Sequence, residues 1–436
     1  MTQGTPDVNF QRDSQDTVAS LAGRLPNKAP AALAGVKTRL LIVSPQPFYQ
    51  DRGTPIAVSQ LAAALSALGY DVDLLAYPIG TPMQLPGLRI FRGHNPFGIR
   101  QVRIGFSLKK LVLGAGMLLP LVWLLRTRDY GAVHVLEELA WPVLALCRRR
   151  NIPVIYDMQS SLPDQLRTHR LFRVGWVQRL LRAFEDWALR RSNAVICSAG
   201  LLTHVKSRSP QVPAYEWKFP GLPRDASDRR TQLRASLGIG ADRHVVMYAG
   251  TFEPYQGIDM LLQALASVAV SAPSVVGVLV GSTPENDLGG HSLTSRLVVE
   301  GKLHVLPRQP RDAMPAYLAM ADMLVSPRAY GDNIPLKIFD YVLSGKPIVA
   351  TDIPAHRSIL DERTAILVEC SGNGLSAGIG HLLANPEIGA RISQAALSTA
   401  SAAPGKQAYI DLVESLYAST LEPGKQAPRA RRARFR

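Results

Sequence analysis

The sequence predicts an α/β protein built from two Rossmann-like halves. Apolar runs of strand length alternate with Ala- and Leu-rich helical segments, which is the order expected of a parallel sheet with helices on its faces. This alternation restarts after a Pro- and Gly-bearing interval between about 208 and 230, which we interpret as an interdomain linker. With 436 residues, the chain is long enough to bury a core in each half.

Composition limits the class of protein. A hydrophobic content of 47% with 19% charged residues is typical of a globular protein with some affinity for membranes. The net charge is +15, and the segment 428–436 concentrates part of it, which suits anionic lipid or another polyanion; the alternative is a solubilising end. Three scattered cysteines indicate neither a disulfide framework nor a metal site, and they favour a reducing cytoplasm.

The first half opens as a nucleotide-type βαβ unit. Residues 1–36 are polar and then rich in Ala and Pro, which predicts a disordered leader without a secretory signal. A buried strand over 39–45 is followed by a loop over 46–54 and a helix to about Leu68. This loop lacks the G-x-G-x-x-G pattern, so dinucleotide binding is unsupported.

The most apolar segment is 107–126. Its uncharged core, 111–125, is shorter than the ~20 residues of a spanning helix, and it contains a proline and two glycines. Three readings stay open: a buried helix of the first half, a helix lying among lipid headgroups, and a transmembrane span. The flanking cations that suit a headgroup layer are Lys109, Lys110, Arg126 and Arg128.

One stretch of the second half carries most of the predicted chemistry. A strand over 323–325 leads into a polar loop, and a helix is predicted from Pro335 with Asp332 or Asn333 as its cap. Gly345 ends this helix before the next strand. Ligands collect at the carboxyl ends of parallel strands, and free N–H groups at a helix start attract phosphate.

Two carboxylates in this stretch stand eight residues apart, Asp332 and Asp340. The phrase DNIPLKIFDY, followed by SGKPIVAT, resembles the E-x7-E motif of retaining GT-B glycosyltransferases of family 4, with Asp replacing Glu at both ends. The resemblance covers about residues 38–420 and is more specific in the second half. A capping Asp plus a solvated Asp on an ordinary helix is the alternative, and the surrounding Pro, Lys and Gly-Lys-Pro context favours the functional interpretation.

The resemblance implies a role for each residue of the motif. In the family, the first acid lies near the transferring sugar, the second holds the nucleotide ribose, and backbone N–H groups between them cradle the diphosphate. Asp332 then becomes the sugar-side acid and Asp340 the ribose acid. Asn333 and Ile334 offer backbone donors, and Lys337 adds a cation near the helix start.

A second donor loop matches the family only in part. Residues 250–257 resemble its G-R-x-x-x-x-K-G loop, with Thr251 where Arg is usual and Gln256 where Lys is usual. Those cations balance the leaving diphosphate, which is worth several kcal/mol in a dry site. Gly250, Thr251 and Gln256 remain donor-binding candidates, and compensation is expected from Lys337, Arg328 and the helix start at Pro335.

The first half supplies weaker matches. A strand from Ala132, expected at the edge of its sheet, runs into Glu137, which keeps the acid of the family's H-x-H-E-P region. Gly53 and Thr54 match its glycine-rich acceptor or phosphate loop, and a tight turn is the alternative for both.

A further strand in the first half ends in a polar loop that contains Asp157 and Gln159. Gln159 stands where the family often has a His, and it can hydrogen-bond a sugar hydroxyl without exchanging a proton. We expect Asp157 and Gln159 to face the sugar or the acceptor; a helix cap at Ser160 or Ser161 is the alternative. His356, later in the chain, is expected to pack or cap.

The resemblance implies a GT-B fold with a crossing helix at the end, and a retaining hexosyltransferase-type enzyme (EC 2.4). The enzyme would move a sugar from a nucleoside-diphosphate sugar to a glycan or lipid-linked acceptor in cell-surface polysaccharide or glycolipid assembly. The alternatives are a catalytically impaired scaffold subunit and another GT-B enzyme such as a sugar epimerase. The predicted domains are the leader 1–36, an acceptor domain 37–212, a donor domain 213–405, a crossing helix 406–423 and a basic tail 424–436.

Partners and location follow from the same interpretation. No cofactor and no metal are expected, because no D-x-D cluster stands in a suitable loop. Nucleic acid is not expected as a partner, since only the charge suggests one, and six of the 15 net positive charges lie in the tail 424–436. We expect a cytoplasmic protein that contacts anionic lipid peripherally at the inner face of the plasma membrane.

Overall fold

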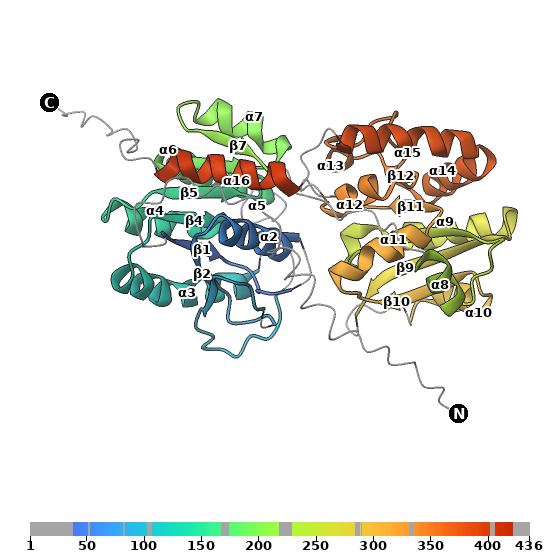
Figure 1. Ribbon diagram of the computed structural model, residues 1–436, viewed down its shortest axis with the longest axis horizontal. Helices are drawn as coiled ribbons and strands as arrows, with labels where there is room; N and C mark the ends of the chain where they lie inside the picture. Colours follow the sequence, from blue (N-terminus) through green and yellow to red (C-terminus); the bar gives the residue numbers. More distant parts are fainter. Residues whose placement is uncertain are drawn as a thin grey trace.

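The computed structural model describes residues 38–50, 53–81, 83–102, 107–166, 174–217, 229–283, 288, 290–330, 335–401 and 406–421. Two parallel sheets, each covered by helices, lie side by side (Figure 1). The predicted architecture of two parallel α/β domains is therefore confirmed.

The first sheet has seven strands in the order β3-β2-β1-β4-β5-β6-β7. All of its pairings are parallel, so the carboxyl ends of the strands share one edge. The strands are β1 (Arg39–Ser44), β2 (Asp71–Ala76), β3 (Leu88–Arg92), β4 (Ala132–Leu136), β5 (Val154–Met158), β6 (Ala194–Cys197) and β7 (Ala214–Glu216). The helices between them are α2 (Gly53–Ala67), α3 (Leu108–Thr127), α4 (Ala140–Arg148), α5 (Leu162–Leu166), α6 (Gly175–Arg191) and α7 (Ala199–Arg208).

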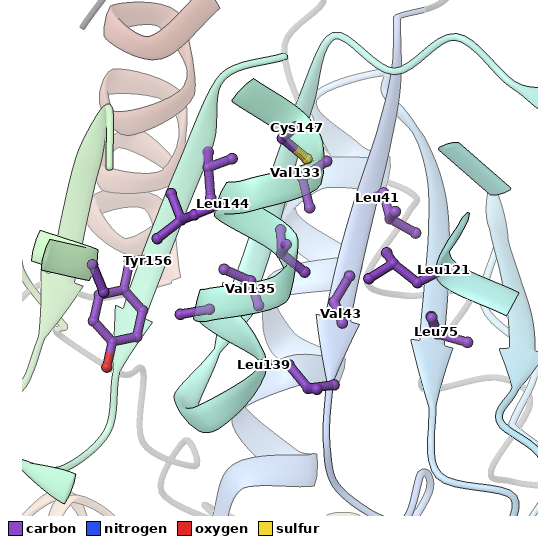
Figure 2. Packing of buried hydrophobic residues seen from close by; sticks show 14 of the residues in the cluster. Leu41, Val43, Leu75, Leu121, Val133, Val135, Leu139, Leu144, Cys147 and Tyr156 are labelled. Atoms are coloured by element: carbon purple, nitrogen blue, oxygen red, sulfur yellow. The ribbon is translucent and has the colours of Figure 1, made fainter. Parts of the chain in front are cut away.

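Successive side chains of these strands enter two separate cores, as the period of two in a strand requires. Leu41 and Val43 of β1 pack against α3, α4, α6 and α7, whereas Leu40 and Ile42 pack against α2 and the last helix. Figure 2 shows the first of these cores, with α4 lying over β1 and β4. Burial on both faces explains why the strands are continuous apolar runs.

Helix α3 is held to this domain through its own irregularities. Pro120 has no N–H, so the carbonyl of Gly116 lacks its helical partner, and the backbone N–H of His94 donates to it at 2.8 Å. A Cβ on Gly116 would lie 2.3 Å from the carbonyl oxygen of His94, so only glycine permits this approach. The proline and the glycine that argue against a membrane span are the residues that dock the helix.

The second sheet has six parallel strands in the order β10-β9-β8-β11-β12-β13. The strands are β8 (His244–Ala249), β9 (Val275–Ser282), β10 (Leu303–Pro307), β11 (Met323–Ser326), β12 (Ile348–Thr351) and β13 (Ile366–Val368). The helices of this domain are α8 (Arg229–Ser236), α9 (Ile258–Ser271), α10 (Ser292–Val299), α11 (Met314–Met320), α12 (Lys337–Ser344), α13 (Pro354–Arg357), α14 (Gly372–Ala384) and α15 (Pro386–Ser401). Short 3₁₀ turns lie at η3 (Pro254–Gln256) and η4 (Arg311–Ala313), and another, η1 (Glu137–Leu139), follows β4 in the first domain.

The last helix, α16 (Lys406–Leu421), returns to the first domain, as Figure 1 shows in red. Its apolar residues join the core beneath α2, and its Tyr417 hydroxyl lies 2.9 Å from Nδ1 of His134 in β4. This is the predicted crossing helix.

Three local expectations were wrong. The strand that begins at Ala132 is not an edge strand: β4 lies between β1 and β5, because the chain crosses over rather than adding strands in order. β7, at 214–216, lies within the predicted linker yet pairs with β6, so the first domain extends beyond the predicted boundary at 212. Helix α12 begins at Lys337 rather than Pro335, because its N-cap is Leu336, and no side chain caps it.

Candidate active site

Lys337 forms the centre of a polar cluster in the second domain. It is the first residue of α12, and its Nζ donates to Oε1 of Gln256 at 2.8 Å. The same ammonium lies 4.0 Å from the ring centroid of Tyr248 in β8, in cation–π geometry. Burial, and then the charge of Arg328, hold the pKa of Lys337 well below its usual range. A cation at the start of a helix opposes the helix dipole, so this position suits an anion that the cluster would bind.

Two glycines place backbone without side chains close to Lys337. Gly250 follows β8 with φ of +151°, and a Cβ there would lie 2.9 Å from Nζ of Lys337. Gly281, in β9, has φ of +134°, and its Cβ would lie 1.9 Å from the carbonyl oxygen of Gly250. Neither position can carry a side chain, so bare backbone adjoins the ammonium.

The loops after β8 and β11 are joined behind this cluster. The N–H of Ala329 donates to the carbonyl of Tyr255 at 2.9 Å, and the guanidinium of Arg328 lies 5.3 Å from the centroid of the Tyr255 ring. Arg328 is buried and donates from Nε to the carbonyl of Tyr330 at 3.0 Å. Thr251 takes part through its backbone, since its carbonyl accepts from the hydroxyl of Tyr248 at 2.6 Å.

His356 holds the carboxyl ends of β11 and β12 together. Its Nε2 lies 2.8 Å from the hydroxyl of Ser326, and its Nδ1 lies 2.7 Å from the carbonyl of Thr351. Burial lowers the pKa of His356 to about 4, so the ring is neutral at pH 7. The hydroxyl of Thr351 donates to the carbonyl of Arg328, which fixes the backbone at that arginine. His356 packs, as the sequence indicates.

Asp340 lies one turn along α12 from Lys337 and already has a cationic partner. Its two carboxylate oxygens accept from Nη1 and Nη2 of Arg311, each at 3.3 Å. The carboxylate side chain is 10% exposed and the arginine side chain 24%. Nothing in the sequence pointed to Arg311, because it stands 29 residues earlier, in the turn after β10.

Asp332, Asn333 and Ile334 lie outside the described residues. Their roles stay predictions from the motif. Of the predicted donor-binding residues that the structure describes, Gly250, Gln256 and Lys337 come together in one cluster.

A second polar cluster lies at the carboxyl end of β5 in the first domain. Oδ1 of Asp157 accepts from Nε2 of Gln159 at 2.6 Å and from Nε1 of Trp217 at 2.9 Å, and Oδ2 lies 3.4 Å from Nε2 of His134. Asp157 is 3% exposed, whereas Gln159 is only partly buried. Asp157 therefore orients Gln159, which is the member of the pair that solvent reaches.

Glu137 stands at the carboxyl end of β4, the neighbouring strand. Its backbone has φ of +51°, and Oε2 accepts from Nε2 of Gln46 at 3.1 Å. Burial, and then the adjacent charge of Glu138, raise the pKa of Glu137 to about 7. Gln46 was not predicted, although its place two residues after β1 was a usable signal.

Gly53 and Thr54 form the first turn of α2. A Cβ on Gly53 would meet no atom within 4 Å, so packing does not require glycine there. In the described part of the chain, no group of three or more His, Cys, Asp or Glu residues could hold a metal ion. Metal independence remains a prediction.

Comparison with known proteins relates both halves to one class. The family described as "Glycosyl transferase 4-like domain" matches residues 52–202, and "Glycosyl transferases group 1" matches residues 243–385. A D-inositol 3-phosphate glycosyltransferase of Streptomyces scabiei is 26% identical over 63% of this chain and 65% of its own length. A phosphatidyl-myo-inositol mannosyltransferase of Mycolicibacterium smegmatis is 22% identical over 80% of this chain and 86% of its own. The chain aligns with only 36%, 65% and 47% of the length of the first three curated relatives.

Solved structures support the fold. Sucrose-phosphate synthase of Thermosynechococcus elongatus superposes with a TM-score of 0.69 at 19% identity, covering 88% of this chain and 98% of that one. HepE of Anabaena, in complex with UDP and glucose, superposes with a TM-score of 0.66 at 18% identity, covering 88% and 100%.

Proposed function

We propose that this chain, which carries the two domains of a GT-B glycosyltransferase, transfers a sugar with retention from a nucleoside diphosphate to a glycan or lipid-linked acceptor. One observation carries the proposal: Lys337 is placed by Gln256 at the start of α12, against bare backbone at Gly250. A diphosphate would meet there an ammonium and helix N–H groups. The complexes of HepE with UDP and with UDP-glucose support a nucleotide-sugar donor.

The cluster accounts for the residues that replace the family's usual cations. Thr251 and Gln256 cannot neutralise a leaving diphosphate. Gln256 instead accepts a hydrogen bond from Lys337, and Arg328 lies close enough to lower the pKa of that lysine. We assign the neutralising charge to Lys337 first and to Arg328 second, and backbone donors to Asn333 and Ile334.

The acids take the roles that the motif implies. Asp340 would hold the ribose, with Arg311 orienting its carboxylate through two hydrogen bonds. Asp332 would bind the hydroxyls of the transferring sugar.

The first domain would present the acceptor. Gln159, oriented by Asp157, would hydrogen-bond a sugar hydroxyl, and Glu137 would accept a hydrogen bond from an acceptor hydroxyl. In the transfer, the bond between the anomeric carbon and the β-phosphate oxygen breaks, and the acceptor oxygen bonds to that carbon on the same face. The acceptor proton passes to the leaving phosphate. The relatives named for inositol phosphate and phosphatidylinositol substrates are consistent with a phosphorylated or lipid-linked acceptor.

A donor panel tests the proposal. UDP-, GDP- and ADP-sugars are screened for hydrolysis and for thermal stabilisation, with Asp332→Ala and Asp340→Ala as variants. Asp411→Ala, an exposed acid on α16, is the matched control. We expect one donor class to be hydrolysed and stabilising, with both effects lost in the two motif variants and retained in the control.

Two results would replace the proposal. Donor binding without turnover, under conditions that include candidate acceptors, would indicate a binding subunit. Release of an epimerised sugar would indicate an epimerase. Unchanged donor affinity in both motif variants would refute the site.

A further inference from the structure

Helix α3 exposes one apolar face to solvent. Its opposite face is buried in the core of the first domain through Leu113, Met117 and Leu121. The outward face carries Leu108 and Leu119, each 73% exposed, with Leu111, Leu118 and Trp123 between and beyond them. Large apolar side chains repeating at helical spacing on the solvent side are unusual for a water-exposed surface.

Helix α6 exposes a second apolar stripe. Trp176, Leu180 and Phe184 stand four residues apart and are 68%, 48% and 43% exposed. The opposite face of α6 buries Gln178, Glu185 and Leu189, and Leu189 lies in the same core that receives α3. The stripe therefore points away from the sheet on the same side as the outward face of α3.

Helix α4 links the two stripes. It packs between α3 and α6 on this face of the sheet, in contact with both. Trp141 of α4 is partly buried and meets the ring of Phe184 with centroids 5.1 Å apart. We call the outward surface of α3, α4 and α6 the α3/α6 face.

Exposed cations lie on or next to the three helices of this face. These cations are Lys109, Arg126, Arg148, Arg149, Arg150, Arg179, Arg182 and Arg190. Of the nearby acids, Asp129 is exposed after α3, and Asp186 of α6 is paired with Arg208 at 2.7 Å and with Arg190 at 3.5 Å. The three helices therefore combine an outward apolar surface with an excess of exposed cations on or next to them.

We propose that the α3/α6 face docks on the surface of a bilayer that contains anionic phospholipid. Apolar side chains would enter the boundary between headgroups and acyl chains, and the arginines and lysine would meet lipid phosphates. Positive charge on or next to an apolar surface favours anionic lipid over a second copy of this face, because two copies would bring like charges together. The inference is independent of the proposed donor site.

The architecture indicates that α3 lies on a membrane rather than crossing it. Of the helices that the structure describes, α3 is the one long and apolar enough to span, and a third of its most apolar window is buried inside the protein. Spanning would remove Leu113, Met117 and Leu121 from the core and break the hydrogen bond from His94 to Gly116. A helix that lies flat on the membrane keeps both the core packing and this hydrogen bond.

Flotation of the full-length protein with vesicles tests the proposal. Vesicles of phosphatidylcholine with 30% phosphatidylglycerol are compared with phosphatidylcholine alone, at low and high salt. The test variant is Leu119→Ser with Trp176→Ser, one exposed residue from each stripe. Its matched control is Val270→Ser with Val299→Ser, which are 84% and 87% exposed on the second domain. Melting curves establish that each variant is folded.

We expect partitioning onto the anionic vesicles to fall at least tenfold in the test variant and to stay within twofold of wild type in the control. High salt or omission of the anionic lipid should weaken wild-type binding. Equal partitioning of test and control variants would overturn the proposal. The proposal would also be overturned if binding were lost only when 424–436 is deleted. Retention of the protein in membranes after a carbonate wash would have the same meaning. So would a dimer that becomes monomeric in the test variant while flotation stays unchanged.

Discussion

Replacing Lys337 with Met separates donor binding from stability. The substitution keeps the length of the side chain and removes the charge that Gln256 positions at the start of α12. We expect weaker binding of the nucleoside diphosphate and no loss of thermal stability. Most substitutions at a partly buried hydrogen-bonded residue destabilise a protein, so this combination is a specific outcome.

The magnitudes follow from the contacts. A hydrogen bond to a charged group contributes about 1.5–3 kcal/mol, so losing one to the diphosphate raises Kd roughly 10- to 150-fold. The effect of the substitution on folding stability should be opposite to its effect on diphosphate binding. Because the pKa of Lys337 lies well below its value in the unfolded chain, the folded state disfavours the charged form of the lysine, and this cost to folding falls as pH rises from the folded pKa towards the unfolded one. Removing the lysine removes that cost and offsets the lost bond to Gln256.

The same lowered pKa predicts proton uptake. A bound diphosphate favours the charged lysine, so wild-type affinity should fall as pH rises through the pKa of the free protein, and the variant should show a flatter profile.

Calorimetric titration with UDP and with GDP in two buffers of different ionisation enthalpy measures Kd and proton uptake, and a melting curve measures stability. Lys206→Met, an exposed lysine on α7, is the control. The reasoning is refuted if the Lys337 variant binds the diphosphate as tightly as wild type, or melts lower while the control does not.

Three further predictions concern single residues. Asp157→Asn should lower the free energy of unfolding by about 1–3 kcal/mol, because the amide N–H₂ group would point at N–H donors, such as that of Trp217, that now donate to the carboxylate. Chemical denaturation measures this free energy. An unchanged denaturation midpoint would contradict the buried hydrogen-bond network. Glu137→Gln should raise Tm more at pH 8 than at pH 5, since a carboxyl with pKa raised to about 7 costs stability when it ionises in the folded protein. An equal increase in Tm at both pH values would exclude ionisation of Glu137 as the cause. Gly281→Ala should destabilise the protein by more than about 2 kcal/mol, because the new Cβ would overlap a backbone oxygen at positive φ. Gly380→Ala, in a helix with open space around it, should be neutral or stabilising by about 0.5–1 kcal/mol. Melting curves of the two variants measured side by side test this contrast.

Local sequence was sufficient for the alternating architecture and for most element positions. The strands around Leu41, Val135 and Leu324 are apolar runs bounded by turn residues, and such runs stop and start where short-range propensity dictates. The motif spacing also placed Lys337 and Asp340 one turn apart on a helix. The start of that helix was misplaced by two residues, because Leu336 takes the cap position and no side-chain cap marks it.

Sequence also indicated which residues matter around the donor loop, but not how they are connected. Gln256 was identified as a departure from the family pattern, where a lysine is usual. Its function is explained by its hydrogen bond with Lys337, a residue 81 positions later in the chain. Such pairings depend on which strands are neighbours, and strand order is a property of the whole fold.

The sequence by itself determined two parallel α/β halves, a motif helix with two acids and a cation, and an unusually apolar segment at 107–126. Only the tertiary structure decided that β4 is central, that Arg311 meets Asp340, and that burial shifts the pKa values of Glu137 and Lys337. The reason is the sequence distance over which each effect acts. Propensity and periodicity act over a few residues, whereas burial and charge pairing depend on segments that meet only after the sheets have assembled.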